Sequence, residues 1–199
     1  MSAIKIPILY HQHGILVVDK PYGLASQPTQ DGAPNLFSLL QQQFPYVAIH
    51  HRLDTPASGV LLFCTDKRWN KAIGQDFQER RITREYWTAC LGTLPKEGYW
   101  KTPIEGRKAR SNFRLIKQCH GYACLQVSLE TGRKHQIRIH SSQAGHPILG
   151  DRRYAESTKR LCPRLALHAN KISFLHPALQ EWCTIESPLP PELHSLLSK

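Results

Sequence analysis

The sequence predicts an α+β fold, with a mixed, largely antiparallel sheet flanked by helices. Segments with the period of strands outnumber those with the period of helices. Several predicted strands also follow one another directly, without a helix between them. The chain has 199 residues and shows no repeat, low-complexity tract or clear linker. We therefore expect one domain, 1–199, large enough to bury its own core, in which 92–98 could divide two halves.

In the first third of the chain, the apolar run at 15–21 predicts a buried strand that ends at Pro21. Turns are expected at Tyr22-Gly23 and Asp31-Gly32. Asn35 can cap a helix whose apolar residues share one face: Leu36, Leu39, Leu40 and Phe44. The apolar run at 59–65 predicts a second buried strand.

The middle of the chain predicts a helix at 67–81, because Trp69, Ile73 and Phe77 recur at helical spacing. Its opposite face is charged, and we interpret that face as solvated. Residues 83–91 alternate as a strand does. Further strands are predicted at 98–104, 112–117 and 122–129.

The last third begins with a predicted helix at 134–144, for which Gly145 is a suitable C-cap. Late strands are predicted at 165–174 and 182–185. Pro190 and Pro191 open a short terminal helix, since proline is tolerated in a first helical turn.

Composition favours a polyanionic partner. Lys plus Arg number 26 and Asp plus Glu 15, which gives a formal charge of +11. The apolar runs are far shorter than the ~20 residues needed to span a bilayer, so we favour nucleic acid over a membrane. The six cysteines form no Cys-x-x-Cys pair, and neither they nor the histidines show metal-ligand spacing. Without an export signal we expect a cytoplasmic protein with reduced cysteines and no metal.

A first polar cluster is His50-His51-Arg52-Leu53-Asp54, just before the buried strand at 59–65. Arginine beside an aspartate favours the ionised carboxylate. An ionised aspartate can act as a nucleophile or a base. An ordinary Arg–Asp salt bridge is the alternative interpretation.

A second cluster is Thr131-Gly132-Arg133-Lys134-His135-Gln136-Ile137-Arg138-Ile139-His140. In a helix from Lys134 onward, Lys134 and Arg138 share a face. Together with Arg133 and the N–H groups of the first turn they would form an anion site. A plain basic surface helix is the alternative.

Together these segments resemble the RluA family of RNA pseudouridine synthases. Residues 51–54 match its His-Arg-Leu-Asp motif, and 131–140 match its Gly-Arg-x-His-Gln-(Ile/Leu)-Arg-x-His motif. Weaker similarities occur at 17–24, 84–87 and 163–169. The motifs stand in the family's order from about residue 8 to 190, most like the RluA branch proper, and they imply the pseudouridine synthase fold.

The resemblance implies that the chain isomerises uridine to pseudouridine in ribosomal RNA or in a tRNA stem-loop, without a cofactor. Asp54 would attack ribose C1′ or remove the C2′ proton; both remain open. Tyr86 would stack on the flipped uracil, and Arg138 would pair with Asp54. The implied substrate-binding residues are Arg52, Arg133, Lys134, His135, Gln136, Ile137 and Leu167. For Ile137 and Leu167 a core role is equally consistent.

Ala57-Ser58-Gly59 stands where the family often has Thr-Ser-Gly, and Thr55-Pro56 is also less usual there. This departure at Thr55-Pro56-Ala57 leaves the shape of the catalytic loop open. We expect a monomer without an obligatory protein partner. We also expect no separate N-terminal RNA-binding domain, so that this domain supplies all RNA affinity.

Two rival functions remain. A catalytically inactive RNA-binding protein would share the charge and the fold. A nucleoside or glycan hydrolase would need a second acidic group, for which Asp19 and Asp151 are candidates.

Overall fold

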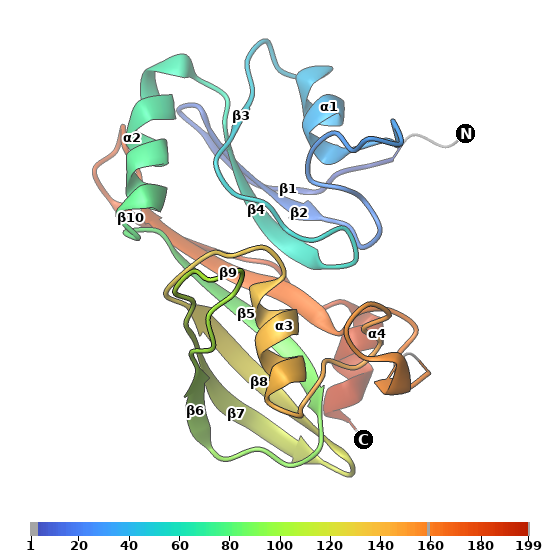
Figure 1. The fold of residues 1–199 in the computed structure, drawn as a ribbon. Coiled ribbons are helices and arrows are strands. Elements are labelled where there is room, and N and C mark those ends of the chain that lie inside the picture. Colours follow the sequence, from blue (N-terminus) through green and yellow to red (C-terminus); the bar gives the residue numbers. More distant parts are fainter. Residues whose placement is uncertain (1–3, 159, 199) are drawn as a thin grey trace. The chain divides into compact units, whose positions relative to one another are not determined.

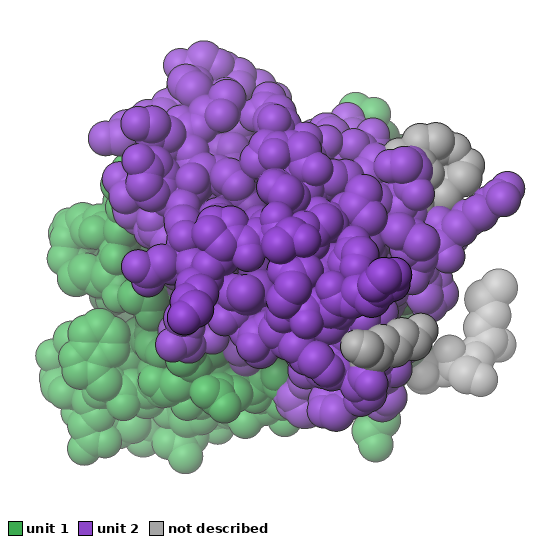
Figure 2. Space-filling model, turned by 90° about the horizontal axis from the view of Figure 1, so that it is seen from below, with its two compact units in different colours: residues 1–83, 171–187 green, residues 84–170, 188–199 purple. Residues whose placement is uncertain are grey.

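The computed structural model describes residues 4–158 and 160–198 (Figure 1). These residues form ten strands, four α-helices and two short 3-10 helices, which confirms the predicted α+β class. They divide into two compact units, coloured separately in Figure 2. Unit 1 comprises 1–83 and 171–187, and unit 2 comprises 84–170 and 188–199. Each unit takes two separate pieces of the chain, and the first division falls at Thr83/Arg84.

Unit 1 is built around two buried strands, β2 (Ile15–Lys20) and β4 (Ser58–Cys64), which pair antiparallel. β1 (Ile8–Gln12) pairs with β2, and the short β3 (Ala48–Ile49) pairs with β4. Every residue of β4 is buried, so its apolar run forms the centre of this core. β10 (Trp182–Glu186) pairs antiparallel with β9 (Leu167–Leu175), of which residues 171–175 belong to unit 1.

The two helices of unit 1 begin at the caps that their sequences provide. Asn35 accepts a hydrogen bond from Ser38 N at the start of α1 (Leu36–Gln41). Asp66 does the same for Arg68 N at the start of α2 (Lys67–Gln78), which packs against β4. Both helices are shorter than predicted. α2 ends because Arg80 adopts a left-handed conformation, with a φ of 61°.

Unit 2 holds an antiparallel sheet in the order β5 (Thr83–Leu91), β8 (Tyr122–Leu129), β7 (Ser111–Cys119) and β6 (Glu97–Trp100). α3 (Gln136–Gln143) packs against β7 (Figure 1). A 3-10 turn at Glu156–Thr158 follows, and α4 (Pro191–His194) with a last turn at Ser195–Leu197 completes the unit.

Gly150 fixes the chain path after α3. Its φ is 72°, and a Cβ atom there would lie 2.0 Å from the carbonyl oxygen of Arg164. No other residue type fits so close to a backbone without displacing it. This turn places Asp151, the next residue, in the interior of unit 2, where it is 1% exposed.

The structure differs from the predicted elements at several ends. β1 and β3 were not predicted, because β1 is a five-residue edge strand without an alternating apolar pattern and β3 has two residues. α3 begins at Gln136 rather than 134, since His135 has a φ of 55° and cannot continue a right-handed helix. β6 ends at Trp100 rather than 104, where the chain leaves the sheet.

Candidate active site

Asp54 lies in the loop 50–57 of unit 1, between β3 and β4, and its side chain is half-buried. Ser26 holds this loop from one side. Its Oγ donates to Leu53 O (2.8 Å) and accepts from Leu53 N (3.1 Å). Ala57 N donates to Asp54 O (2.9 Å), which closes a turn around the aspartate. The backbone on both sides of Asp54 is therefore fixed within unit 1.

Lys20 also holds this loop, through hydrogen bonds to backbone carbonyl groups. Its ammonium group is fully buried and donates to three carbonyl oxygens, those of Pro21 (2.9 Å), Leu24 (2.7 Å) and Thr55 (3.3 Å). A buried ammonium requires such partners, because losing its hydration is costly. The lysine thus ties the turn after β2 to the residue that follows Asp54.

The two histidines before Asp54 both lie beside Phe77 of α2, and His51 is the closer. The imidazole of His51 stacks on the Phe77 ring at 4.6 Å, and its Nε2 accepts a hydrogen bond from Leu62 N of β4 (3.0 Å). His50 meets Asn70 Oδ1 through Nε2 (2.8 Å). Burial lowers the pKa of His50, although the Asn70 contact opposes that shift. Arg52, between His51 and Leu53, is exposed.

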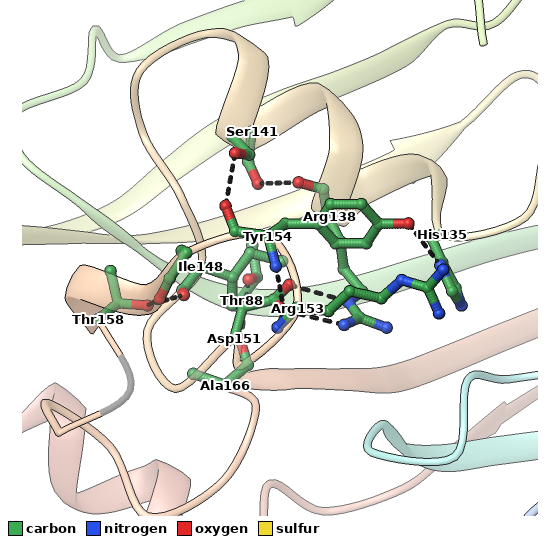
Figure 3. A network of polar contacts seen from close by, with 12 residues as sticks. Thr88, His135, Arg138, Ser141, Ile148, Asp151, Arg153, Tyr154, Thr158 and Ala166 are labelled. Carbon is green, nitrogen blue, oxygen red and sulfur yellow. Dashed lines mark hydrogen bonds and ion pairs between the residues drawn. The ribbon is translucent and has the colours of Figure 1, made fainter. Parts of the chain in front are cut away.

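The remaining predicted site residues belong to unit 2. Tyr86 lies in β5 opposite Val127, and its side chain is 5% exposed. Ile137 in α3 and Leu167 at the start of β9 are also buried. The segment before β9 is joined to β5 through Ala166 O, which accepts from Thr88 Oγ1 (2.9 Å) and Ala89 N (3.2 Å) (Figure 3).

Arg138 of α3 forms a buried ion pair with Asp151 (Figure 3). Its Nε donates to Asp151 Oδ2 and its Nη2 to Asp151 Oδ1, both at 2.8 Å. The ring of Tyr154 lies 5.0 Å from the guanidinium carbon. Because two donors of Arg138 are held by one carboxylate, the plane of its guanidinium is fixed. The pairing of Arg138 with Asp54 stays a prediction.

Asp151 is itself held by the backbone. Its Oδ1 accepts from Arg153 N (2.9 Å) and Tyr154 N (3.1 Å). Burial alone would raise the pKa of this carboxyl, but the hydrogen bonds from Arg138, Arg153 and Tyr154 hold it below its ordinary value. Asp151 is thus an ionised residue whose acceptor atoms are occupied.

Of the polar residues in the second motif, Gln136 is used inside unit 2. Its Oε1 accepts from Thr131 Oγ1 (2.7 Å) and Arg133 N (3.0 Å). Its Nε2 donates to Arg110 O (2.9 Å) and Ser111 Oγ (3.0 Å). A substrate contact by Gln136 stays a prediction, but these four bonds already satisfy its amide.

The other motif residues differ in exposure. Lys134 is exposed, while Arg133 is partly exposed and donates through Nε to Lys108 O (3.2 Å). His135, in its left-handed conformation, places Nδ1 2.7 Å from the hydroxyl of Tyr154. Arg133 N donates a hydrogen bond to Gln136 Oε1, so this backbone N–H group just before α3 already has a partner.

Sequence reasoning missed several residues that build these two loops, namely Lys20, Ser26, His51 and Tyr154. The resemblance covered the segments of Lys20 and His51 without giving either side chain a role. Asp151 was considered only as an acid for a hydrolase. Each makes at least one contact with a residue distant in the sequence, which a local pattern does not indicate.

Comparison with known proteins identifies the family. Residues 14–143 match the family model described as RNA pseudouridylate synthase, and that range contains both 51–54 and 131–140. The chain belongs to the RNA pseudouridylate synthase family. Relatives named RluA confirm the RluA resemblance, and solved structures confirm the predicted fold.

Among its relatives, the chain is 32% identical to the dual-specificity RNA pseudouridine synthase RluA of Escherichia coli O157:H7, over 91% of this chain and 92% of that protein. It is 32% identical to ribosomal large subunit pseudouridine synthase D of Nitrosomonas europaea, over 98% of this chain. It spans 65% of the length of that protein and 61% of the length of the Neisseria meningitidis serogroup A synthase D.

Solved structures of family members share the fold. The human protein named RNA pseudouridylate synthase domain containing 4 superposes with a TM-score of 0.78 at 23% identity, over 96% of this chain and 92% of that one. The human protein named RNA pseudouridylate synthase domain containing 1 superposes with a TM-score of 0.79 at 24% identity, over 95% of this chain and 86% of that one. Among the described residues, no helix is both long and apolar enough to cross a membrane.

Proposed function

We propose that this chain is an RNA pseudouridine synthase that isomerises specific uridines through Asp54. The observation that carries the proposal is the family match over 14–143, which includes the His51–Asp54 segment. The local structure supports it, since Ser26, Lys20 and the Ala57 turn fix the backbone around this aspartate. A catalytic group gains much of its rate effect from being held in place before the substrate arrives.

In the proposed reaction the bond between uracil N1 and ribose C1′ breaks, the base turns, and a bond forms between C5 and C1′. The proton on C5 leaves to solvent, and N1 gains one. Asp54 begins the reaction either by attacking C1′ or by removing the proton from C2′. The target uridine must first leave its stack, at a cost of a few kcal/mol, which RNA–protein contacts offset.

The other residues assist in this proposal. Tyr86 stacks on the flipped uracil, and Arg52 takes the space that the base leaves. Arg138, oriented by Asp151, supports the ionised state of the catalytic carboxylate. Arg133, Lys134, His135, Gln136, Ile137 and Leu167 complete the proposed substrate contacts.

The contacts of Asp151 weigh against the hydrolase alternative. A hydrolase that activates water needs a second carboxylate with a free acceptor. Asp151 has both oxygens engaged by Arg138, and its Oδ1 also accepts two backbone N–H groups.

The test is incubation of the protein with RNA transcripts that carry tritium at uridine C5. Isomerisation releases tritium and gives pseudouridine; a hydrolase releases free uracil; an inactive binding protein changes nothing. Asp54→Asn should eliminate tritium release while RNA affinity stays within a few-fold and the melting curve is unchanged. Release of tritium by the purified variant would contradict the assignment of Asp54.

The RNA target is proposed from the relatives. One relative is named for dual specificity and others for the ribosomal large subunit. We propose large-subunit ribosomal RNA or a tRNA stem-loop as substrate, and a monomer that acts in the cytoplasm. Mapping pseudouridines in cells that lack the gene identifies the target, and light scattering measures the oligomeric state.

A further inference from the structure

Four side chains of the second motif hold one neighbouring segment of unit 2, residues 101–110, which joins β6 to β7 (Figure 1). His140 Nε2 lies 2.9 Å from Thr102 O, and Arg133 Nε donates to Lys108 O (3.2 Å). Thr131 Oγ1 accepts from Arg110 N (2.9 Å), and Gln136 Nε2 donates to Arg110 O (2.9 Å). The motif thus fixes this segment at its start, in its middle and at its end.

The segment also has internal structure. Ile104 and Arg107 exchange both backbone hydrogen bonds, each 3.0 Å long. The two residues between them, Glu105 and Gly106, have φ angles of 50° and 69°, as a tight hairpin turn requires. Ile104 and Ala109 are buried. The backbone is therefore held in one shape before any ligand binds.

Apart from the exposed Glu105, the charged side chains that this shape presents are basic. Lys101, Arg107 and Lys108 are exposed, and in the part of the chain that the structure describes none of them forms an ion pair. Arg110, by contrast, pairs with Glu130 at 3.0 Å. The centre of the half-exposed Tyr99 ring lies 5.6 Å from Lys101 Nζ. Cations and an exposed aromatic ring together are typical of surfaces that bind single-stranded nucleic acid.

We propose that residues 101–110, the basic loop, bind backbone phosphates of the RNA substrate through Lys101, Arg107 and Lys108. The second motif acts here as a positioning element for the basic loop. This inference rests on the proposed function and adds an RNA contact that the motif sequence did not indicate.

The physical argument is one of preorganisation. Three like charges on one short segment repel one another, so their proximity does not stabilise the free protein. The buried contacts from the motif hold them together nonetheless. A loop that is already ordered loses little entropy when it binds, and phosphate contacts then contribute nearly their full value.

The experiment compares two triple variants with the parent protein. The first, Lys101→Gln, Arg107→Gln and Lys108→Gln, neutralises the basic loop. The second, Lys71→Gln, Lys96→Gln and Arg114→Gln, also removes two lysines and one arginine, but from exposed sites outside the basic loop. Affinity for the RNA is measured from 50 to 300 mM salt, together with kcat, KM and thermal melting.

We expect a parent slope of log affinity against log salt of about −3 or steeper, because each phosphate contact to single-stranded RNA adds about −0.7. The loop variant should have a slope shallower by about 2 and a KM about tenfold higher. Its kcat and melting temperature should be unchanged, and the control variant should match the parent.

Equal effects of both triple variants would overturn the proposal, because the total charge and not the loop would then set affinity. A loop variant that matches the parent, or that loses kcat at constant KM, would overturn it too. Failure of the proposed function is separate: the parent itself would then release no tritium from labelled RNA.

Discussion

Arg138 and Asp151 meet through two parallel hydrogen bonds of 2.8 Å in the interior of unit 2. Their side chains are 5% and 1% exposed. Because both charges are buried away from water, the ion pair replaces part of the hydration that each has lost, and two backbone N–H groups also stabilise Asp151. The relationship gives Arg138 a fixed direction, and it makes Asp151 a positioning residue for an arginine of the second motif.

Asp151→Asn should destabilise the protein by about 3–5 kcal/mol, because it leaves the buried guanidinium of Arg138 without its carboxylate. Urea unfolding measures the loss. Glu130→Gln is the matched control: its partner Arg110 lies at 3.0 Å in an exposed pair. Exposed pairs contribute about 0–1 kcal/mol. Equal decreases in the free energy of unfolding in the two variants would show that the buried Arg138–Asp151 pair stabilises the protein no more than an exposed pair.

Tyr86→Phe should reduce tritium release at least tenfold if its hydroxyl takes part in proton transfer, while the melting temperature stays close to that of the parent. Tyr86→Ala is a less specific test, because it should destabilise the fold as well. The side chain is 5% exposed, and truncating a buried aromatic ring costs about 3–5 kcal/mol. Phenylalanine keeps the ring. Parent-like activity of Tyr86→Phe would limit Tyr86 to stacking and packing.

Stability should fall as the pH is lowered below 6.5, in part because of His140. Burial lowers the pKa of this imidazole from 6.5, although the hydrogen bond to Thr102 O opposes the shift. The unfolded chain therefore binds a proton more readily than the folded one, and the contribution of His140 is lost as the pH falls through the folded pKa.

Melting temperatures between pH 8 and 5.5 measure this dependence. His140→Asn should give a flatter curve and a lower stability at pH 8, because the amide replaces the ring only in part. The remaining slope should include His50, whose pKa burial also lowers. An unchanged slope in His140→Asn would exclude His140 as a source.

Only Cys183 should react readily with iodoacetamide at pH 8 in the folded protein. Cys183 is half-buried, whereas the other five cysteines are buried. Burial raises the pKa of Cys90 to about 12, so its reactive thiolate is scarce. Mass spectrometry of the labelled protein counts the modified residues, and labelling in urea should reach all six. Rapid labelling of Cys90 in the folded protein would contradict this expectation, because it would mean that β5 unfolds locally and exposes the thiol.

The sequence predicted those elements that a local pattern specifies. β8 has the predicted bounds, Tyr122–Leu129, and β5 has its predicted Thr83–Leu91. Asn35 caps the helix that follows it, as predicted, because capping is a contact between near neighbours in the chain. The motifs at 51–54 and 131–140, in order with the weaker similarities at 17–24, 84–87 and 163–169, indicated the family, which the match over 14–143 confirms.

The tertiary structure decided what the motif side chains do. The sequence indicates Gln136 and Arg133 as substrate contacts, which stays a prediction. The fold adds internal contacts: Gln136 joins Thr131 to Arg110 and Ser111, and Arg133 holds Lys108. Asp151 also acts on a residue distant in the sequence: the turn at Gly150 places it in the interior, where it pairs with Arg138. Such roles depend on which buried donors and acceptors form hydrogen bonds between residues distant in the sequence. A local sequence pattern carries no information about those pairings.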